Sequence, residues 1–181
     1  MNYSINNFFE KEECSSIIEY ADRVGKKFNY NPYEVWDCKR IADEDFNKLI
    51  IDRWWKNYNE NKFNLWFSLN NFEIKDFNIS MTKYYDGRRL NLHLDGTSQL
   101  TTVIVLNDEF SDGRFMLSET PNEIDSEKHF LEMGQSISFD GSKIYHGVMP
   151  VTNGIRCALN IWMTDTDFKY LKLPIVNKKL I

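Results

Sequence analysis

The sequence predicts an α+β chain, mainly β, in which N-terminal helices pack on the major sheet of a jelly-roll core, a double-stranded β-helix. Two observations predict this fold class. Apolar residues recur at helical spacing in the first part of the chain, whereas from Phe77 onward they alternate with polar residues. Turn dipeptides containing Gly then separate a series of short strands, and this spacing is typical of double-sheet jelly rolls.

Length and composition indicate one folded domain. The chain has 181 residues, of which 42% are hydrophobic and 15% aromatic, so disorder is excluded. We expect a single domain over 1–181, with mostly helical support in 1–75, the jelly-roll core in 76–165 and a C-terminal tail in 166–181. The net charge of −5 excludes a basic surface at the level of the whole chain, so no nucleic-acid partner is expected.

Cysteine usage and hydropathy bear on the compartment. The three cysteines are odd in number and lack Cys-x-x-Cys spacing, which argues against a disulfide framework and against a cysteine zinc site. No run approaches the roughly 20 apolar residues of a membrane span. The N-terminus shows no basic region followed by an apolar run. We therefore expect a cytoplasmic protein without a membrane partner, and the sequence leaves the oligomeric state open.

Two helices are expected in the first part of the chain. The first covers Lys11–Val24, begins with acidic residues that suit the helix dipole, and ends before Gly25. The second runs from Asp45 to near Tyr58. Their apolar stripes consist of Cys14, Ile17, Ile18, Ala21 and Val24 in the first helix, and Phe46, Leu49, Ile50 and Trp54 in the second. The aromatic segment between them, Tyr30–Arg40, is a candidate lid over a site.

Short strands are expected throughout the second part. The first begins at Phe77, and the others lie at Leu92–Asp95, Leu100–Leu106, Gly113–Leu117, Phe130–Met133, Ser136–Phe139, Tyr145–Met149 and Ile155–Met163. The last strand alternates most regularly. One face carries Arg156, Ala158, Asn160 and Trp162, and the other, towards the core, carries Cys157, Leu159, Ile161 and Met163.

The sequence His93-Leu94-Asp95 places two metal-binding side chains on one strand face, because side chains alternate with a period of two. His146, on another strand, would complete two imidazoles and one carboxylate around one ion. This facial triad leaves coordination positions open and is the usual ligand set of non-haem Fe(II) oxygenases. The chain has only three histidines, and two of them fit this pattern.

Arg156 follows His146 by ten positions and supplies a fixed cation for a dicarboxylate co-substrate. If Asn153-Gly154 forms a two-residue hairpin turn, His146 and Arg156 lie five strand positions apart, about 16 Å. An odd number of positions would place them on opposite faces. We therefore expect a bulge, for which Gly147 and Pro150 are natural places, or a longer turn to correct the register.

Three stretches, KYYDGRRLNLHLD, LTTVIVLNDEFSDGRFML and HGVMPVTNGIRCALNIW, resemble the Fe(II)/2-oxoglutarate-dependent dioxygenase superfamily, and in it the prolyl 4-hydroxylase-like branch. The resemblance covers Met81 to Trp162 directly. The Tyr-x-x-Gly of the family matches Tyr84 and Gly87, and its Leu-Asn before an acidic turn matches Leu106-Asn107. The Trp that the family has six residues after its basic anchor matches Trp162.

This resemblance implies roles for individual residues. Arg156 would bind the distal carboxylate of 2-oxoglutarate, and Tyr84 would donate a hydrogen bond to this co-substrate. A Tyr that is common in the family is Val105 here, so we expect Thr102 or another polar neighbour to supply the missing hydroxyl. The iron ligands, which form the catalytic centre, would be His93, Asp95 and His146.

The resemblance also implies a reaction. The cofactors would be Fe(2+), 2-oxoglutarate as co-substrate and O2, with ascorbate as a candidate reductant. The enzyme would hydroxylate an unactivated C–H bond and release succinate and CO2. Because Asp95 is present, whereas halogenating relatives lack that carboxylate, hydroxylation is favoured over halogenation. The branch suggests a prolyl residue of a peptide or protein as the substrate, and the candidate substrate contacts are Trp162, Asn160, Tyr33, Trp36 and Arg114.

Three other functions remain open. A hydroxylase of a free amino acid or small metabolite would need a charged anchor, for which Arg88, Arg89 and Arg114 are the candidates. A β-sandwich could also be a non-catalytic binding module in which the His and Asp residues are incidental. An isomerase or dioxygenase that uses another metal without 2-oxoglutarate would not need Arg156.

Overall fold

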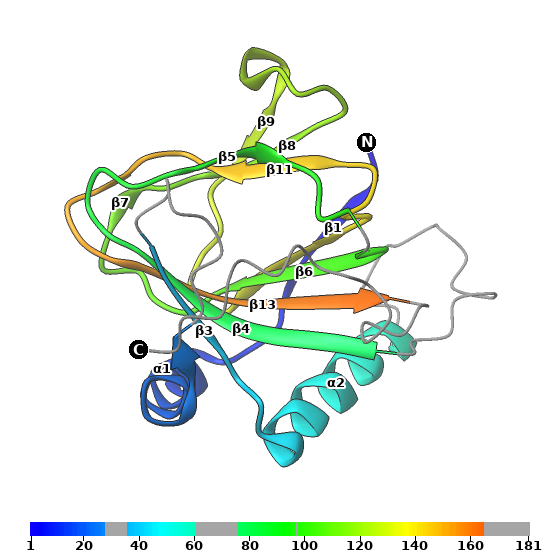
Figure 1. The fold of residues 1–181 in the computed structure, drawn as a ribbon, viewed down its shortest axis with the longest axis vertical. Helices are drawn as coiled ribbons and strands as arrows, with labels where there is room; N and C mark the ends of the chain where they lie inside the picture. The colour runs from blue at the N-terminus through cyan, green and yellow to red at the C-terminus, as the bar shows by residue number, and fades with distance from the viewer. Residues whose placement is uncertain (28–35, 61–75, 97, 165–181) are drawn as a thin grey trace.

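The computed structural model describes residues 1–27, 36–60, 76–96 and 98–164, and Figure 1 shows their arrangement. Two antiparallel sheets face each other, and two helices lie against the outer face of the larger sheet. A small two-stranded sheet joins them at one end. This is the expected jelly roll with N-terminal helices on its major sheet.

The larger sheet has the strand order β1-β10-β6-β13-β4-β3-β2, the smaller β5-β11-β8-β9, and the third pairs β12 with β7. The helices are α1 (Lys11–Val24) and α2 (Glu44–Asn59), and a 3-10 turn, η2, covers Glu123–Asp125. The strands are β1 (Tyr3–Asn7), β2 (Lys26–Lys27), β3 (Trp36–Arg40), β4 (Asp76–Tyr84), β5 (Leu90–His93), β6 (Leu100–Val105), β7 (Ser111–Asp112), β8 (Phe115–Ser118), β9 (Glu127–His129), β10 (Gln135–Phe139), β11 (Tyr145–Val148), β12 (Val151–Thr152) and β13 (Arg156–Thr164).

Both helices form where the sequence predicts them. The bounds of α1 agree with the prediction, and the Glu13 carboxylate accepts a hydrogen bond from the backbone N–H of Glu10 at its start. Its buried residues, Cys14, Ile17 and Ala21, face the larger sheet together with Trp54 of α2. Helix α2 begins one residue earlier than predicted.

The side chains of strand β13 alternate between two hydrophobic cores, one on each face of the larger sheet. Cys157, Leu159, Ile161 and Met163 pack into the core beneath the helices, as predicted. The opposite face contributes Ala158 to a second core between the two sheets. Phe115, Leu117 and Val148 of the smaller sheet complete this second core. The inner face of β13 therefore looks into the space between the sheets, where the candidate site lies.

Two predicted strands differ from the structure. Phe130–Met133 is not a strand, since strand β9 lies before it and ends at His129; Phe130 is 62% exposed and Leu131 is buried. The strand predicted over Leu92–Asp95 ends at His93, so Asp95 belongs to the following turn.

The region 1–75, expected to be mostly helical, also supplies strands to the larger sheet. Strand β1 pairs with β10 at one edge, and β3 pairs with β4 on the other side. The sequence of β1, YSINN, has too few apolar residues to signal a strand by itself, and its partner β10 provides the register. The expected tail, 166–181, lies outside the described residues.

Strands β11 and β13 do not form the two-residue hairpin considered around Asn153-Gly154. Strand β11 belongs to the smaller sheet and β13 to the larger, and the turn leads into β13 from β12, which pairs with β7. His146 and Arg156 therefore lie on different sheets. The odd number of strand positions between them then does not place their side chains on opposite faces of one hairpin. A register shift does occur near Gly147, but it lies in the pairing of β11 with β5.

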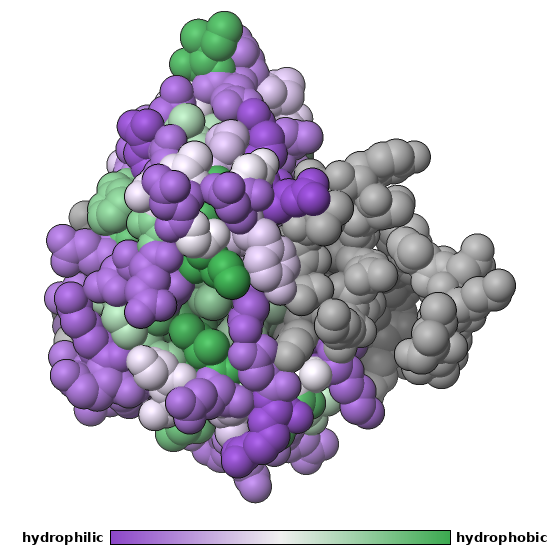
Figure 2. Space-filling model, turned by 90° about the vertical axis from the view of Figure 1, so that its left-hand side faces the viewer, coloured by the Kyte–Doolittle hydropathy of each residue, from purple (hydrophilic) through white to green (hydrophobic). Residues whose placement is uncertain are grey.

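The surface in Figure 2 is largely hydrophilic, with apolar side chains in small separate patches. Among the described residues, the most exposed large apolar side chain is Ile124 in η2. In the same part of the chain, no helix is long and apolar enough to cross a membrane.

Candidate metal centre and active site

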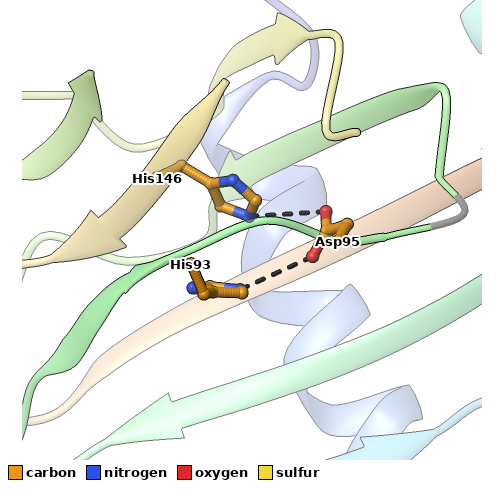
Figure 3. Close-up of side chains that lie close together, drawn as sticks. All are labelled: His93, Asp95 and His146. Atoms are coloured by element: carbon orange, nitrogen blue, oxygen red, sulfur yellow. Dashed lines mark ion pairs between the residues drawn. The ribbon is translucent and has the colours of Figure 1, made fainter. Parts of the chain in front are cut away.

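His93, Asp95 and His146 come together between the sheets, as Figure 3 shows. His93 ends β5, and His146 lies directly opposite it on β11, with ring centres 4.3 Å apart. Asp95 reaches both rings from the turn after β5. Its Oδ1 lies 3.5 Å from His93 Nε2, and its Oδ2 lies 3.4 Å from His146 Nε2. One ligand atom from each residue falls within 4.8 Å of the others, which suits a single metal ion.

Backbone carbonyls orient both imidazoles. His93 Nδ1 lies 3.0 Å from the carbonyl oxygen of Asn91, and His146 Nδ1 lies 3.0 Å from that of Ile144. A carbonyl only accepts hydrogen bonds, so each Nδ1 carries the proton and donates it. In the neutral rings each Nε2, on the side of Asp95, is then available to bind a metal ion, as is usual for metal-binding histidines.

The Asp95 carboxylate is held in its ionised form. Burial by itself would raise the pKa of Asp95, but when the imidazoles of His146 and His93 are protonated and no metal is bound, their charges and Nε2–H hydrogen bonds outweigh burial and hold the pKa of Asp95 well below its usual range. An ionised carboxylate between two Nε2 atoms is the donor set that a divalent ion such as Fe(II) binds. The three residues therefore fit a facial triad.

Arg156 lies on the inner face of β13 and is 1% exposed. Its Nη1 is buried without a hydrogen-bond partner among the described residues. Burial lowers the pKa of Arg156 from its ordinary value, yet a guanidinium stays protonated under any working condition. A buried donor nitrogen without a partner is costly, so this cation is suited to an anionic ligand such as a carboxylate.

Tyr84 faces Arg156 directly on the neighbouring strand β4. The Arg156 guanidinium carbon lies 5.7 Å from the centre of the Tyr84 ring. Gly113 also lies close to the Arg156 side chain, because a Cβ at position 113 would be 3.2 Å from Arg156 Cδ. Strand β4 and the turn before β8 thus fix the direction of the guanidinium.

The prediction for Thr102 was wrong. Its hydroxyl accepts a hydrogen bond from Trp54 Nε1 of α2 at 3.1 Å and lies 2.8 Å from Ser138 Oγ. Thr102 therefore faces the helices, on the opposite side of β6 from Arg156. The inner face of β6 carries Thr101 and Val105 instead, so Thr102 does not replace the hydroxyl that Val105 lacks.

The candidate substrate residues lie in different places. Asn160 is on the inner face of β13, and its amide donates to the Ser80 carbonyl and to Thr82 Oγ1. Trp162 lies beside the triad and donates its indole N–H to Asp95. Arg114 forms an ion pair with its neighbour Asp112 at the surface.

The candidate lid lies partly outside the described residues. Tyr33 is not among the described residues. Trp36 begins β3, where its backbone is in register with Tyr84, and nothing is described of its side chain. The second half of the candidate lid, Trp36–Arg40, is thus a strand of the larger sheet rather than a loop.

Sequence reasoning missed Thr101, whose hydroxyl donates to Asp95 Oδ2. The run LTTVIV is buried on both faces of β6, so no alternation distinguishes Thr101 from Thr102. The carbonyl acceptors of the two histidines were also missed, because a backbone group carries no sequence signal. Both acceptors lie two residues before their histidine.

Residues 79–164 match the model of the 2OG-Fe(II) oxygenase superfamily. This range contains the triad, Tyr84 and Arg156. None of the curated proteins matches the chain in sequence.

Solved structures with a similar fold include several prolyl hydroxylases. A prolyl-4-hydroxylase from Pseudomonas putida gives a TM-score of 0.70 at 15% identity, over 91% of this chain and 93% of that one. A collagen prolyl hydroxylase of Paramecium Bursaria Chlorella virus-1, in complex with 2OG, gives 0.63 at 18%, over 90% and 96%. A Trichoplax adhaerens prolyl hydroxylase bound to a hypoxia inducible factor peptide fragment gives 0.64 at 18%, over 90% and 83%. At these identities the likeness shows a shared fold.

Proposed function

We propose that this chain, which belongs to the 2OG-Fe(II) oxygenase superfamily, hydroxylates a prolyl residue of a peptide or protein. The observation that carries the proposal is the combination of the triad with a buried arginine whose Nη1 lacks a partner among the described residues. Fe(2+), 2-oxoglutarate and O2 are the cofactors that the family implies. A non-catalytic sandwich would have no use for a buried guanidinium with an unpartnered Nη1 beside a metal-binding cluster.

Each residue of the site has a role in this proposal. His93, Asp95 and His146 hold the iron, and their backbone and side-chain partners keep them in place before it binds. Arg156 takes the distal carboxylate of 2-oxoglutarate through its planar fork, and the Tyr84 ring supports the guanidinium. Bound iron with 2-oxoglutarate and O2 supplies the oxidation that converts 2-oxoglutarate to succinate and CO2 and hydroxylates a C–H bond.

The two sheets of the jelly roll keep bulk water away from the reacting groups. Phe115 of β8 and Phe139 of β10 pack their rings against His146 at centroid distances of 6.1 and 4.6 Å. His146 is therefore buried, whereas His93 keeps a partly exposed side chain. We infer that substrate approaches the metal from the side of His93.

Two observations support a peptidyl substrate. The solved structures of similar fold include prolyl hydroxylases, one of them bound to a peptide. Most of the nitrogens that could anchor a small amino acid are occupied or exposed: Arg89 pairs with Glu123 through Nη2, with only its Nε buried and lacking a partner among the described residues, Arg114 pairs with Asp112, and Arg88 lies at the surface. A closed pocket with its own charged anchor is not formed by these three residues.

A substrate screen tests the proposal. Proline-containing peptides and free amino acids, including proline, are incubated side by side with Fe(II), 2-oxoglutarate and ascorbate. We expect the peptides to gain the mass of one oxygen atom and to couple this gain to succinate formation. Asp95→Ala should abolish both signals. Coupled hydroxylation of a free amino acid, with all peptides inert, would refute the peptidyl assignment while leaving the oxygenase assignment intact.

A further inference from the structure

The two carboxylate oxygens of Asp95 have different surroundings. Oδ2 accepts hydrogen bonds from the Thr101 hydroxyl and from Trp162 Nε1, the latter at 2.9 Å. Oδ1 lies near His93 Nε2, and among the described residues no hydroxyl, indole or backbone N–H donates to it. One oxygen is thus fixed by two donors, and the other is left for a ligand.

The two donors come from neighbouring strands. Thr101 on β6 and Trp162 on β13 are direct cross-strand partners, so their side chains stand next to each other on the inner face of the larger sheet. Asp95 reaches them from across the space between the sheets. The chain therefore brings together three distant segments at a single carboxylate oxygen.

Gly141 completes this arrangement from the turn before β11. Its carbonyl accepts a hydrogen bond from the backbone N–H of Asp95 at 2.8 Å. A Cβ at this position would lie 2.2 Å from Thr101 Oγ1 and 2.9 Å from Asp95 Oδ2. Only glycine leaves room for the hydroxyl and the carboxylate to meet there.

We propose that Thr101 and Trp162 are positioning residues that hold Asp95 Oδ2, so that the carboxylate binds the metal through Oδ1 alone. This inference rests on the proposed function, because it assigns Asp95 as an iron ligand. A carboxylate that binds through one oxygen occupies one coordination position and leaves the others open for the co-substrate and O2. It also reassigns Trp162 from contact with the substrate to orientation of a metal ligand.

The fold supplies a matched control on the other face of β6. There the indole N–H of Trp54 in α2 donates a hydrogen bond to the hydroxyl of Thr102, the next residue. Both side chains are fully buried, as Thr101 nearly is. This outer pair points towards the helices and makes no contact with the triad, so its loss affects stability without affecting the metal.

The test measures affinity for Mn²⁺, a redox-stable divalent ion, by the electron paramagnetic resonance signal of the free ion. The variants are Thr101→Val, Thr101→Ser and Trp162→Phe, with Thr102→Val and Trp54→Phe as controls and Asp95→Ala as the loss-of-ligand reference. Melting curves of the metal-free proteins are recorded in parallel. Loss of a hydrogen bond to a metal ligand typically weakens metal binding by about 10- to 100-fold.

We expect Thr101→Val and Trp162→Phe to raise the Mn²⁺ dissociation constant by about 10- to 100-fold. Thr101→Ser, which keeps the hydroxyl, should bind like the unaltered protein. Thr102→Val and Trp54→Phe should lower the melting temperature and leave the dissociation constant unchanged. Unchanged Mn²⁺ affinity in both Thr101→Val and Trp162→Phe, or an equal loss in the outer pair, would overturn the positioning role alone. If the unaltered protein binds Mn²⁺ no more tightly than Asp95→Ala does, both the metal centre and the positioning role are refuted.

Discussion

Arg156 and Tyr84 are direct cross-strand partners on β13 and β4, and the guanidinium lies over the tyrosine ring. This relationship fixes the direction of a cation that is buried between two sheets, with one nitrogen, Nη1, lacking a partner among the described residues. The triad lies in the same interior space, on the side of the smaller sheet. The co-substrate site that we propose therefore spans the two sheets, with the metal held mainly by one and the carboxylate anchor by the other.

Arg156→Gln should raise the 2-oxoglutarate concentration needed for half-maximal turnover far more than it weakens Mn²⁺ binding, because the anchor is lost and the triad is not. Arg156→Lys should recover only part of the affinity, since an ammonium lacks the planar fork. Decarboxylation is followed against 2-oxoglutarate concentration in each variant. An unchanged 2-oxoglutarate requirement in Arg156→Gln would place the anchor elsewhere and favour a metal enzyme that does not use 2-oxoglutarate.

His93→Ala and His146→Ala should each abolish metal-dependent turnover while the chain stays folded. Removal of one imidazole leaves too few ligands for the ion but does not remove an apolar core residue. The remaining histidine, His129, is the control, since its ring lies tilted against that of Tyr3 at the edge of the smaller sheet, away from the triad. Metal content and melting temperature are measured for all three variants. Normal metal content in His146→Ala would disprove the triad.

Gly113→Ala should impair 2-oxoglutarate binding specifically. Its Cβ would press on Arg156 Cδ and, at 3.0 Å, on Val151 Cγ2, so the guanidinium must shift. Gly87→Ala is the matched control, because Gly87 also has a positive φ, 75°, but has no atom within 4 Å of the added Cβ. Each variant should lose about 1 kcal/mol of stability to backbone strain. Only Gly113→Ala should also raise the 2-oxoglutarate requirement, and equal effects in both would remove Gly113 from the site.

Cys14 and Cys157 should resist alkylation in the native protein. Burial, helped by the charge of Glu13, raises the pKa of Cys14 to about 11, and burial also raises the pKa of Cys157. The reactive thiolate is therefore scarce at pH 8, and both thiols are shielded. Mass spectrometry after brief iodoacetamide treatment, with and without denaturant, measures this. Rapid native labelling of Cys14 would show that the core beneath the helices opens readily.

The elements that sequence reasoning predicted well are those with a strong local pattern. Helix α1 has a regular apolar stripe, acidic residues at its start and Gly25 at its end, and its bounds agree with the prediction. Strand β13 alternates between a fully apolar and a mixed face. Strand β1 has no such pattern, because its place in the sheet depends on β10.

The candidate site was predictable where side-chain chemistry is unusual. Two histidines and an aspartate with this spacing, followed by Arg156, stand out in a chain with three histidines. Non-local pairing was not predictable. The turn at Asn153-Gly154 resembles a hairpin locally, but the strands around it enter different sheets. Thr101 and Thr102 are equally buried, and only the fold decides which of them faces Asp95.

The most direct test of the central claim is an anaerobic titration of the metal-free protein with Fe(II) and 2-oxoglutarate, followed by visible absorption. An iron ion chelated by 2-oxoglutarate has a weak charge-transfer band, and we expect this band to appear only when both are present. It should be absent from His146→Ala and should need more 2-oxoglutarate in Arg156→Gln. A titration of the unaltered, folded protein that shows no band at any 2-oxoglutarate concentration would contradict the assignment of this site as an iron and 2-oxoglutarate centre.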